Sequence, residues 1–484
     1  MTMTVTETPP GESTVPPAPR VAVLVGVLSL AVFMSGLDLF IVNLAFPTIT
    51  RSFRGTDIGS LSWILNAYTI VFAAVLVPAG RWADRVGRRR MLIAGLVVFA
   101  LGSAACGVAG GPSLLIAARV VQAVGAGLMV PASLSLLLAA VPATHRVQAI
   151  GSWSAFAALG AAAGPVIGGL LVEVSWRWVF WVNLPVAVIA VVASLKTLPE
   201  SKDPDVLHHP DVIGAILLAA GVGLIAYGLV DAPTWGWGSW RFVTALVGGF
   251  AVLGATVLRS RHHPSPVLEL GLLRARSFSG ALGASILYYA GFGAFVLNSV
   301  EFLTGVWHYS PIRAGLAIGP GPLMVLPFAR LIAPRLAARL GGPGRVAVIG
   351  ALVNAAAQAL WWSAMTVHPA YVTHLLPVQL LGGAGVGLTI PSLLGAGSAS
   401  LPPARFGTGS GVLNMSRQVG TVLGVAGLVA ILTHVTATDP LPVFRHGTLL
   451  IVGFFLAAAV VTGALLTGRP QPVVVVEAVP VGAS

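Results

Sequence analysis

Long apolar runs separated by short polar segments make up most of this chain. Fourteen runs can be read, most of them near or above the roughly 20 residues that a helix needs to cross a bilayer. They lie at residues 21–47, 61–80, 91–110, 113–141, 147–173, 177–198, 212–230, 241–258, 278–304, 311–333, 346–366, 371–398, 408–434 and 447–467. Because a helix satisfies its own backbone hydrogen bonds in lipid, this pattern predicts an all-α polytopic membrane protein with about 14 transmembrane helices.

Composition supports this prediction. The chain is 56% hydrophobic and 9% charged, whereas soluble domains carry about 25% charged residues. The net charge of +12 suggests nucleic acid as a partner, but the charges fall in short segments between the apolar runs. Insertion bias and lipid headgroups account for charges in those places. We therefore expect membrane lipids as partners and no nucleic acid.

The chain shows no phosphate-binding loop, nucleophile elbow or metal-ligand spacing, and its single cysteine, Cys106, allows no internal disulfide. We therefore expect that the protein is not an enzyme and that it has no metal, cofactor or ATP site. Residues 1–19 are expected to be a disordered N-terminal tail, and residues 469–484 a C-terminal tail.

Residues 80–90, here called the basic segment, hold five arginines and one aspartate between two apolar runs. Basic segments next to membrane helices stay on the cytoplasmic side, and this assignment puts 18 Lys and Arg residues inside and six outside. The sequence thus predicts a multi-pass protein of the cell membrane with both termini cytoplasmic. Within the basic segment, two glycines allow a tight turn, and Asp84 is expected to bind an arginine or a helix N-terminus.

The two halves of the chain share an internal repeat. Arg81, Arg85 and Gly87 recur 254 residues later, and two groups of glycines recur 260 residues later. Two related six-helix halves with a site between them are typical of transporters. The repeat is unequal, because Asp84 is matched by Ala338 and Arg119 by Gln379. Ionic chemistry is therefore expected mainly in the first half.

Among the charged residues inside apolar runs, three are candidates for transport chemistry. An aspartate such as Asp38 costs about 2.5–3.5 kcal/mol at the centre of a membrane helix. It is either a group that binds and releases a proton there or a carboxylate near a helix end that an arginine neutralises. Arg119 needs a carboxylate, backbone carbonyls or water at its depth, or it reaches toward an interface. Glu301 lies near the outer end of its run. It is either a second proton-binding or cation-recognising group, or a solvated residue at a helix end.

Residues 160–169 contain five candidate packing positions: Gly160, Gly164, Pro165, Gly168 and Gly169. Glycines at i, i+4 and i+8 share one face of a helix and let a neighbouring backbone approach closely, while a proline bends the helix. We expect the run at 311–333 to be the neighbour, because its Gly315 and Gly319 have the same spacing.

These motifs together resemble the major facilitator superfamily. Gly80, Asp84, Arg85, Gly87 and Arg88 match its loop between helices 2 and 3, and residues 160–169 match its fifth-helix antiporter motif. Residues 37–47, 115–125, 176–185, 309–316 and 414–420 resemble the fourteen-helix branch of drug:proton antiporters (EmrB/QacA-like).

The resemblance implies two six-helix bundles at 20–199 and 278–468, joined at 200–277 by two linker helices. It also implies that Asp38 and Arg119 couple transport to protons, that the basic segment is a conformational switch, and that the glycine motif favours export. The expected function is proton-coupled antiport of small amphipathic or cationic compounds by a monomer. Alternatives are a dedicated exporter of one endogenous metabolite and, from another class, a non-transporting membrane scaffold or sensor.

Overall fold

The computed structural model describes residues 18–141, 146–202, 209–398, 406–433 and 439–468, and these contain helices and no strand. Within these described residues, thirteen helical segments are long and apolar enough to cross a membrane. The 29-residue helix α5 occupies the place of the remaining predicted span. The all-α polytopic fold with about 14 crossings is therefore confirmed. Most of both predicted tails lies outside the described residues, although the first helix begins at Ala18.

The first half of the chain forms a six-span bundle. Its helices are α1 (Ala18–Ser52), α2 (Ile58–Val86), α3 (Arg88–Gly107), α4 (Pro112–Ala140), α5 (Arg146–Val174), α6 (Trp178–Trp181) and α7 (Asn183–Thr197). Helices α1 and α5 pack along each other, and α4 packs against both α2 and α3. The short α6 and the longer α7 together make the sixth span.

Two linker helices and the second bundle follow. The linker comprises α8 (Val212–Trp235), α9 (Trp240–His262) and the short α10 (Leu270–Leu273). The second bundle comprises α11 (Arg276–Gly305), α12 (Pro311–Ile318), α13 (Pro320–Pro327), η2 (Phe328–Ile332), α14 (Ala333–Leu340), α15 (Pro343–Ala364), η3 (Tyr371–Leu375), α16 (Leu376–Ser398), α17 (Phe406–Leu432) and α18 (Leu441–Leu466).

Polar residues at the helix starts fix several of these boundaries. Asp57 accepts a hydrogen bond from the Ser60 amide at 2.8 Å, and Asp211 accepts one from the Gly214 amide at 2.8 Å. Ser310 caps α12, whose first residue is Pro311. Such caps satisfy N–H groups that have no partner within the helix, so the spans start where the sequence places Asp or Ser before an apolar run.

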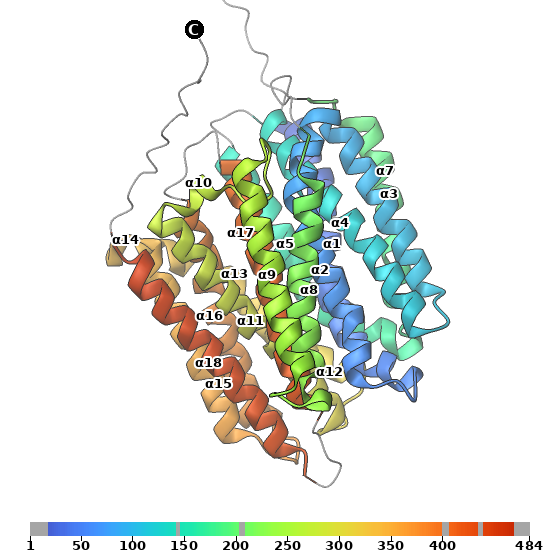
Figure 1. The fold of residues 1–484 in the computed structure, drawn as a ribbon, viewed down its shortest axis with the longest axis vertical. Helices are drawn as coiled ribbons and strands as arrows, with labels where there is room; N and C mark the ends of the chain where they lie inside the picture. Colours follow the sequence, from blue (N-terminus) through green and yellow to red (C-terminus); the bar gives the residue numbers. More distant parts are fainter. Residues whose placement is uncertain (1–17, 142–145, 203–208, 399–405, 434–438, 469–484) are drawn as a thin grey trace, which may run out of the picture.

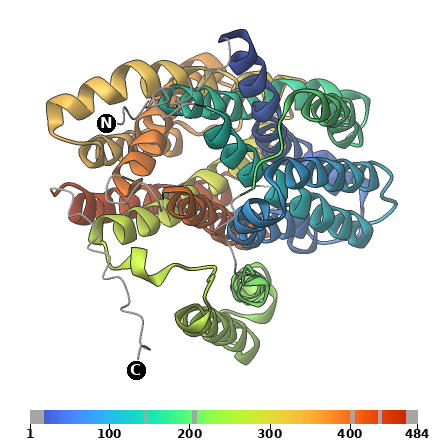
Figure 2. The same cartoon turned by 90° about the horizontal axis from the view of Figure 1, so that it is seen from above.

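The two bundles meet along several helix pairs. Helix α2 packs against α17, α5 against α12, and α1 against α11. Viewed along the helices in Figure 2, the pair α8 and α9 lies outside the two bundles, and α8 packs against both α2 and α17. Many apolar side chains of α9, including Val247 and Phe250, are exposed, which suits a helix that faces lipid.

Candidate functional site

Asp38 and Arg119 form an ion pair inside the first bundle. Asp38 Oδ2 lies 2.6 Å from Arg119 Nη1, and the two side chains are 0% and 1% exposed. Asp38 comes from the middle of α1 and Arg119 from the second turn of α4. Two residues that the sequence singled out separately thus neutralise each other directly.

Amide side chains complete the environment of this carboxylate. Gln122 Nε2 donates to Asp38 Oδ1 at 2.8 Å, and Asn183 Nδ2 donates to the same oxygen at 3.2 Å. The hydroxyl of Ser103 accepts from both amides, at 3.3 and 3.0 Å, and donates to the Phe180 carbonyl. Buried polar groups need such partners, because an unpaired one costs free energy. We call Asp38, Arg119, Gln122, Asn183 and Ser103 the Asp38 network.

Arg119 has further partners. Its Nη1 also donates to Gln122 Oε1 at 2.7 Å, and its Nε donates to the Ile64 carbonyl at 3.1 Å. The guanidinium carbon lies 3.9 Å from the ring centroid of Tyr68, at cation–π distance. The arginine is therefore held inside the bundle and does not reach an interface. Breaking a buried ion pair of this kind by removing one partner is strongly destabilising.

Sequence reasoning missed three members of the network, Gln122, Asn183 and Ser103. Gln122 follows Arg119 by three residues, so both occupy one helix face, a spacing that was readable in the sequence. Asn183 is the first residue of α7 and lies within residues 176–185, which resemble the fourteen-helix branch. Ser103 carries no sequence signal, since one serine in an apolar helix is common.

The basic segment is mostly helical, although its glycines suggested a loop. Helix α2 continues to Val86 and α3 begins at Arg88, so only Gly87 stands between them, with φ at +130°. The prediction that Gly80 takes part in the turn is wrong, because Gly80 lies inside α2. The positive φ favours glycine at position 87, and a Cβ there, 2.8 Å from the Glu200 carboxyl group, would also displace that side chain.

Two carboxylates hold this turn. Asp84 pairs with Arg88 at 2.8 Å, and Arg88 also donates to the Ser201 hydroxyl at 2.9 Å. Glu200 accepts from the backbone amides of Arg89 and Arg90 at 3.0 and 3.3 Å, at the N-terminus of α3. Asp84 was expected to bind an arginine or a helix N-terminus. It binds an arginine, and Glu200 is the carboxylate at the N-terminus of α3. The side chain of Arg85 lies beside this turn, and its Nη1 has no hydrogen-bond partner among the described residues.

The glycine face of α5 packs against α1. A Cβ added at Gly160 would meet the Phe33 carbonyl oxygen, one at Gly164 would lie 2.6 Å from Phe40 Cβ, and one at Gly168 would lie 2.9 Å from Ile41 Cγ1. The expectation that this face packs against the run at 311–333 is therefore wrong. The order of helices in the bundle, which spacing does not encode, puts α1 on that side.

The predicted contact with 311–333 exists on the adjacent face of α5. A Cβ at Gly169 would lie 2.6 Å from Ile312 Cα, and one at Gly315 would meet the Pro165 carbonyl oxygen. Residues 165 and 169 of the first bundle thus contact α12 of the second bundle. The contact leaves no room for a larger side chain at position 169 or 315. This contact joins the halves near the ends of α5 and α1 opposite the basic segment.

Glu301 is not part of the Asp38 network. It lies one turn before the end of α11, and its Oε1 has no hydrogen-bond partner among the described residues. The neighbouring Arg51 donates to the Thr304 carbonyl at 3.4 Å and forms no ion pair with Glu301. The buried Oε1 does not fit a fully solvated helix end.

The second bundle has different polar chemistry at the matching positions. Gln379, which corresponds to Arg119, is buried, and Asn298, 260 residues after Asp38, donates to Thr448 at 3.2 Å. Arg417 of α17 lies 4.6 Å from the Tyr289 ring centroid and donates to Asn414 at 2.9 Å. The symmetric counterpart of the Asp38–Arg119 pair is thus uncharged.

Comparison with known proteins places these features in a family. Residues 28–425 match the Major Facilitator Superfamily. The chain is 35% identical to the puromycin resistance protein pur8 of Streptomyces alboniger, covering 89% of this chain and 86% of that protein. It is 34% identical to a probable actinorhodin transporter of Streptomyces coelicolor, covering 85% and 72%. It is 32% identical to the multidrug resistance protein Stp of Mycobacterium tuberculosis, covering 86% and 78%.

A solved structure shows the same fold at lower sequence identity. The crystal structure of an auto-inhibited POT family peptide transporter aligns with a TM-score of 0.66 at 16% identity, covering 94% of this chain and 99% of that one. This likeness concerns the fold alone.

Proposed function

The chain belongs to the Major Facilitator Superfamily, and from this premise we propose that it is a secondary active exporter, moving small amphipathic or cationic compounds outward as protons enter. Support for export comes from relatives named for puromycin resistance, multidrug resistance, and resistance to and export of tetracenomycin C. In this proposal the protein resides in the cell membrane with both termini cytoplasmic. It acts as a monomer and catalyses no covalent chemistry.

The buried Asp38–Arg119 pair is the observation that carries proton coupling in this proposal. Asp38 as an anion is matched by a guanidinium at 2.6 Å and two amide donors. Protonation of Asp38 removes the charge that holds Arg119, so the arginine must find new partners. Proton binding and rearrangement of the first bundle are linked for this reason.

The contact between the halves supports alternating access. Helix α5 touches α1 through its glycine face and α12 through residues 165 and 169. Because Asp38 lies on α1 within this packed group, a shift of α1 is passed to α5 and then to the second bundle. We propose that protonation of Asp38 changes the balance between inward-open and outward-open states in this way, with the basic segment as the switch at the cytoplasmic side.

The proton gradient suffices as the energy source. One charge that crosses about 100 mV releases about 2.3 kcal/mol. Since about 1.4 kcal/mol corresponds to a factor of ten, this energy sustains a substrate gradient of about fifty-fold. The proposal therefore includes no ATP site and no cofactor.

A dedicated exporter is the second candidate. The relatives include proteins named for one compound, such as the probable actinorhodin transporter and the tetracenomycin C export protein. A narrow substrate profile would favour a dedicated exporter, whereas a broad profile would favour multidrug efflux. A scaffold or sensor function would be favoured by the absence of any proton-linked flux.

Transport into inverted membrane vesicles tests the proposal directly. Uptake of a compound panel is measured while internal pH is recorded, for the native protein, for Asp38→Asn and for the matched control Asp231→Asn on α8. We expect proton-linked uptake by the native and control proteins and none by Asp38→Asn. Full proton-linked uptake by Asp38→Asn would remove Asp38 from the coupling role.

A further inference from the structure

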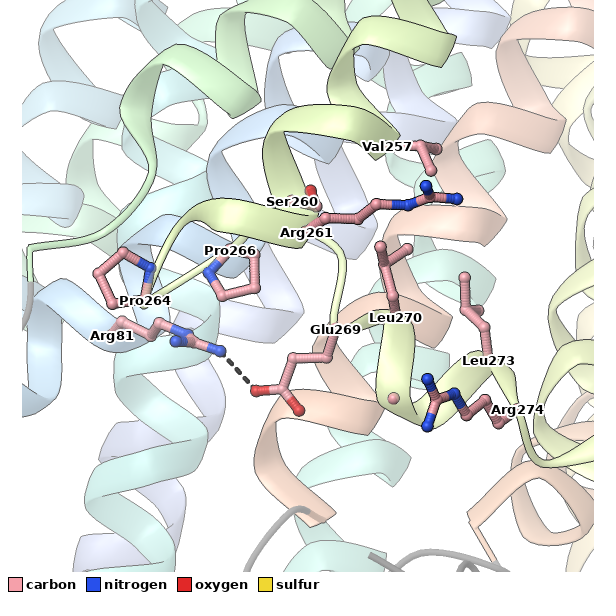
Figure 3. Close-up of a pocket in the computed structure, with 11 residues that line it drawn as sticks. Arg81, Val257, Ser260, Arg261, Pro264, Pro266, Glu269, Leu270, Leu273 and Arg274 are labelled. Carbon is pink, nitrogen blue, oxygen red and sulfur yellow. Dashed lines mark hydrogen bonds and ion pairs between the residues drawn. The ribbon is translucent and has the colours of Figure 1, made fainter. Parts of the chain in front are cut away.

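A cavity of about 750 Å³ lies at the end of α9, beside the basic segment and away from the Asp38 network. Figure 3 shows that side chains from α9, from the segment after it and from α2 surround this space. The lining residues are Arg81, Val257, Ser260, Arg261, Pro264, Pro266, Glu269, Leu270, Gly271, Leu273 and Arg274. By the topology proposed above, the cavity opens at the cytoplasmic side of the membrane.

The charge of this cavity is unbalanced. Arg81 is neutralised, because its Nη2 lies 2.5 Å from Glu269 Oε1 and its Nη1 donates to Ser265 at 2.6 Å. Arg261 and Arg274 are exposed and form no ion pair with any described residue. The nearby Arg259, by contrast, pairs with Asp211 at 2.7 Å. Two guanidinium groups therefore remain available to an anion.

The remaining lining is suited to an amphiphilic ligand. Ser260 is 5% exposed, and its hydroxyl has no hydrogen-bond partner among the described residues. Leu270, Leu273 and Val257 add apolar surface, and Figure 3 shows the guanidinium groups of Arg261 and Arg274 on opposite sides of Leu270. A small inorganic anion would use the cationic groups and leave this apolar surface in water.

An apolar track leads from the cavity along α9. Phe250 and Val243 lie seven and fourteen residues before Val257, so all three share one helix face. Phe250 is 62% exposed and Val243 is 48% exposed, as expected of side chains that contact lipid. A ligand whose headgroup occupies the cavity would have its hydrocarbon chain beside this face.

We propose that this cavity binds the phosphate group of an anionic phospholipid from the cytoplasmic leaflet. The Arg261 and Arg274 guanidinium groups flank the headgroup from the two sides of Leu270 and neutralise its phosphate charge, and the Ser260 hydroxyl donates to the headgroup. One acyl chain lies along the apolar face of α9. The bound lipid links the end of α9 to α10, next to the Arg81–Glu269 ion pair that ties this segment to α2. This site is independent of the proposed transport reaction.

The test uses the full chain in nanodiscs of zwitterionic phosphatidylcholine. Phosphatidylglycerol is added in steps, and its binding is measured by native mass spectrometry and by the shift in unfolding midpoint. In separate arms, inorganic phosphate and glycerol 3-phosphate replace the lipid. The test variant is Arg261→Gln/Arg274→Gln. The control is Arg335→Gln/Arg339→Gln, which removes the same charge from exposed arginines of α14 at the same end of the molecule.

We expect phosphatidylglycerol to raise the midpoint of the native and control proteins, and the test variant to bind it at least tenfold more weakly. Equal unfolding midpoints in phosphatidylcholine alone would establish that all three proteins are folded. An equal loss in the control variant would reduce the effect to general surface charge and overturn the proposal. A full response to inorganic phosphate or glycerol 3-phosphate would identify a free-anion site, and no response to phosphatidylglycerol would exclude the lipid.

Discussion

Replacing Asp38 and Arg119 singly and together separates their electrostatic role from proton coupling. Asp38→Asn leaves the Arg119 guanidinium, 1% exposed, with only neutral acceptors: the oxygens of Gln122 and Ile64 and the amide oxygen at position 38. Arg119→Gln leaves a buried carboxylate with two amide donors. Removing one partner of a buried ion pair costs about 3–5 kcal/mol, because an uncompensated charge stays buried, whereas replacing both partners by apolar residues of similar volume is often neutral. Replacing both by neutral amides likewise leaves no unpaired charge in the bundle. The double variant should therefore be more stable than either single variant.

The single cysteine of the chain provides the assay. Cys106 is 0% exposed, and its Sγ lies 3.8 Å from Gln122 Oε1, directly beside the Asp38 network. A thiol reagent can label it only when this part of the bundle opens. A cost of about 3–5 kcal/mol corresponds to labelling on the order of 10²- to 10⁴-fold faster, since each factor of ten is about 1.4 kcal/mol.

We expect fast labelling of both single variants, slow labelling of Asp38→Asn/Arg119→Gln, and native labelling of the control Asp231→Asn. The double variant should still lack proton-linked export, because no group at position 38 can exchange a proton. Unchanged labelling in the single variants would refute the electrostatic argument. Proton-linked export by the double variant would refute the role of Asp38 in coupling.

Three further predictions concern the other candidate residues. Gly164→Leu should reduce export per membrane-inserted molecule, because its Cβ would lie 2.6 Å from Phe40 Cβ and overpacking costs about 1–3 kcal/mol; Gly248→Leu, with open space around it, is the control. Asp84→Ala should slow transport in vesicles without changing substrate preference, since it removes a 2.8 Å ion pair at the turn; an altered profile at native rate would contradict this. Glu301→Gln should leave the pH dependence of export unchanged, because no described contact joins it to the Asp38 network, and a flattened pH profile would disprove that separation.

The hydrophobic pattern alone located most of the membrane-spanning helices. The predicted run at 212–230 became Val212–Trp235, and the run at 278–304 became Arg276–Gly305. This agreement has a simple cause, because a bilayer requires a minimum length of apolar helix whatever its neighbours are. The depth of Asp38 and Arg119 in their runs was readable for the same reason.

The sequence predicted only some of the contacts between helices. Asp38 and Arg119 are 81 residues apart, and nothing in their spacing states that α1 and α4 adjoin. The glycines at 160, 164 and 168 had to share a face, yet whether α1 or α12 covers it depends on the order of helices in the bundle. Both α8 and α9 are apolar and carry no sign of where they pack.

The sequence by itself thus determined the membrane class, the approximate number and position of the spans, and which residues bear charge inside them. Tertiary structure alone decided that Asn183 and Ser103 complete the Asp38 network and that Glu269 meets Arg81. Local patterns report burial and helix periodicity, which depend on neighbouring residues in the chain. Contacts between distant charges depend on how the helices are arranged, which the packing of all spans sets together.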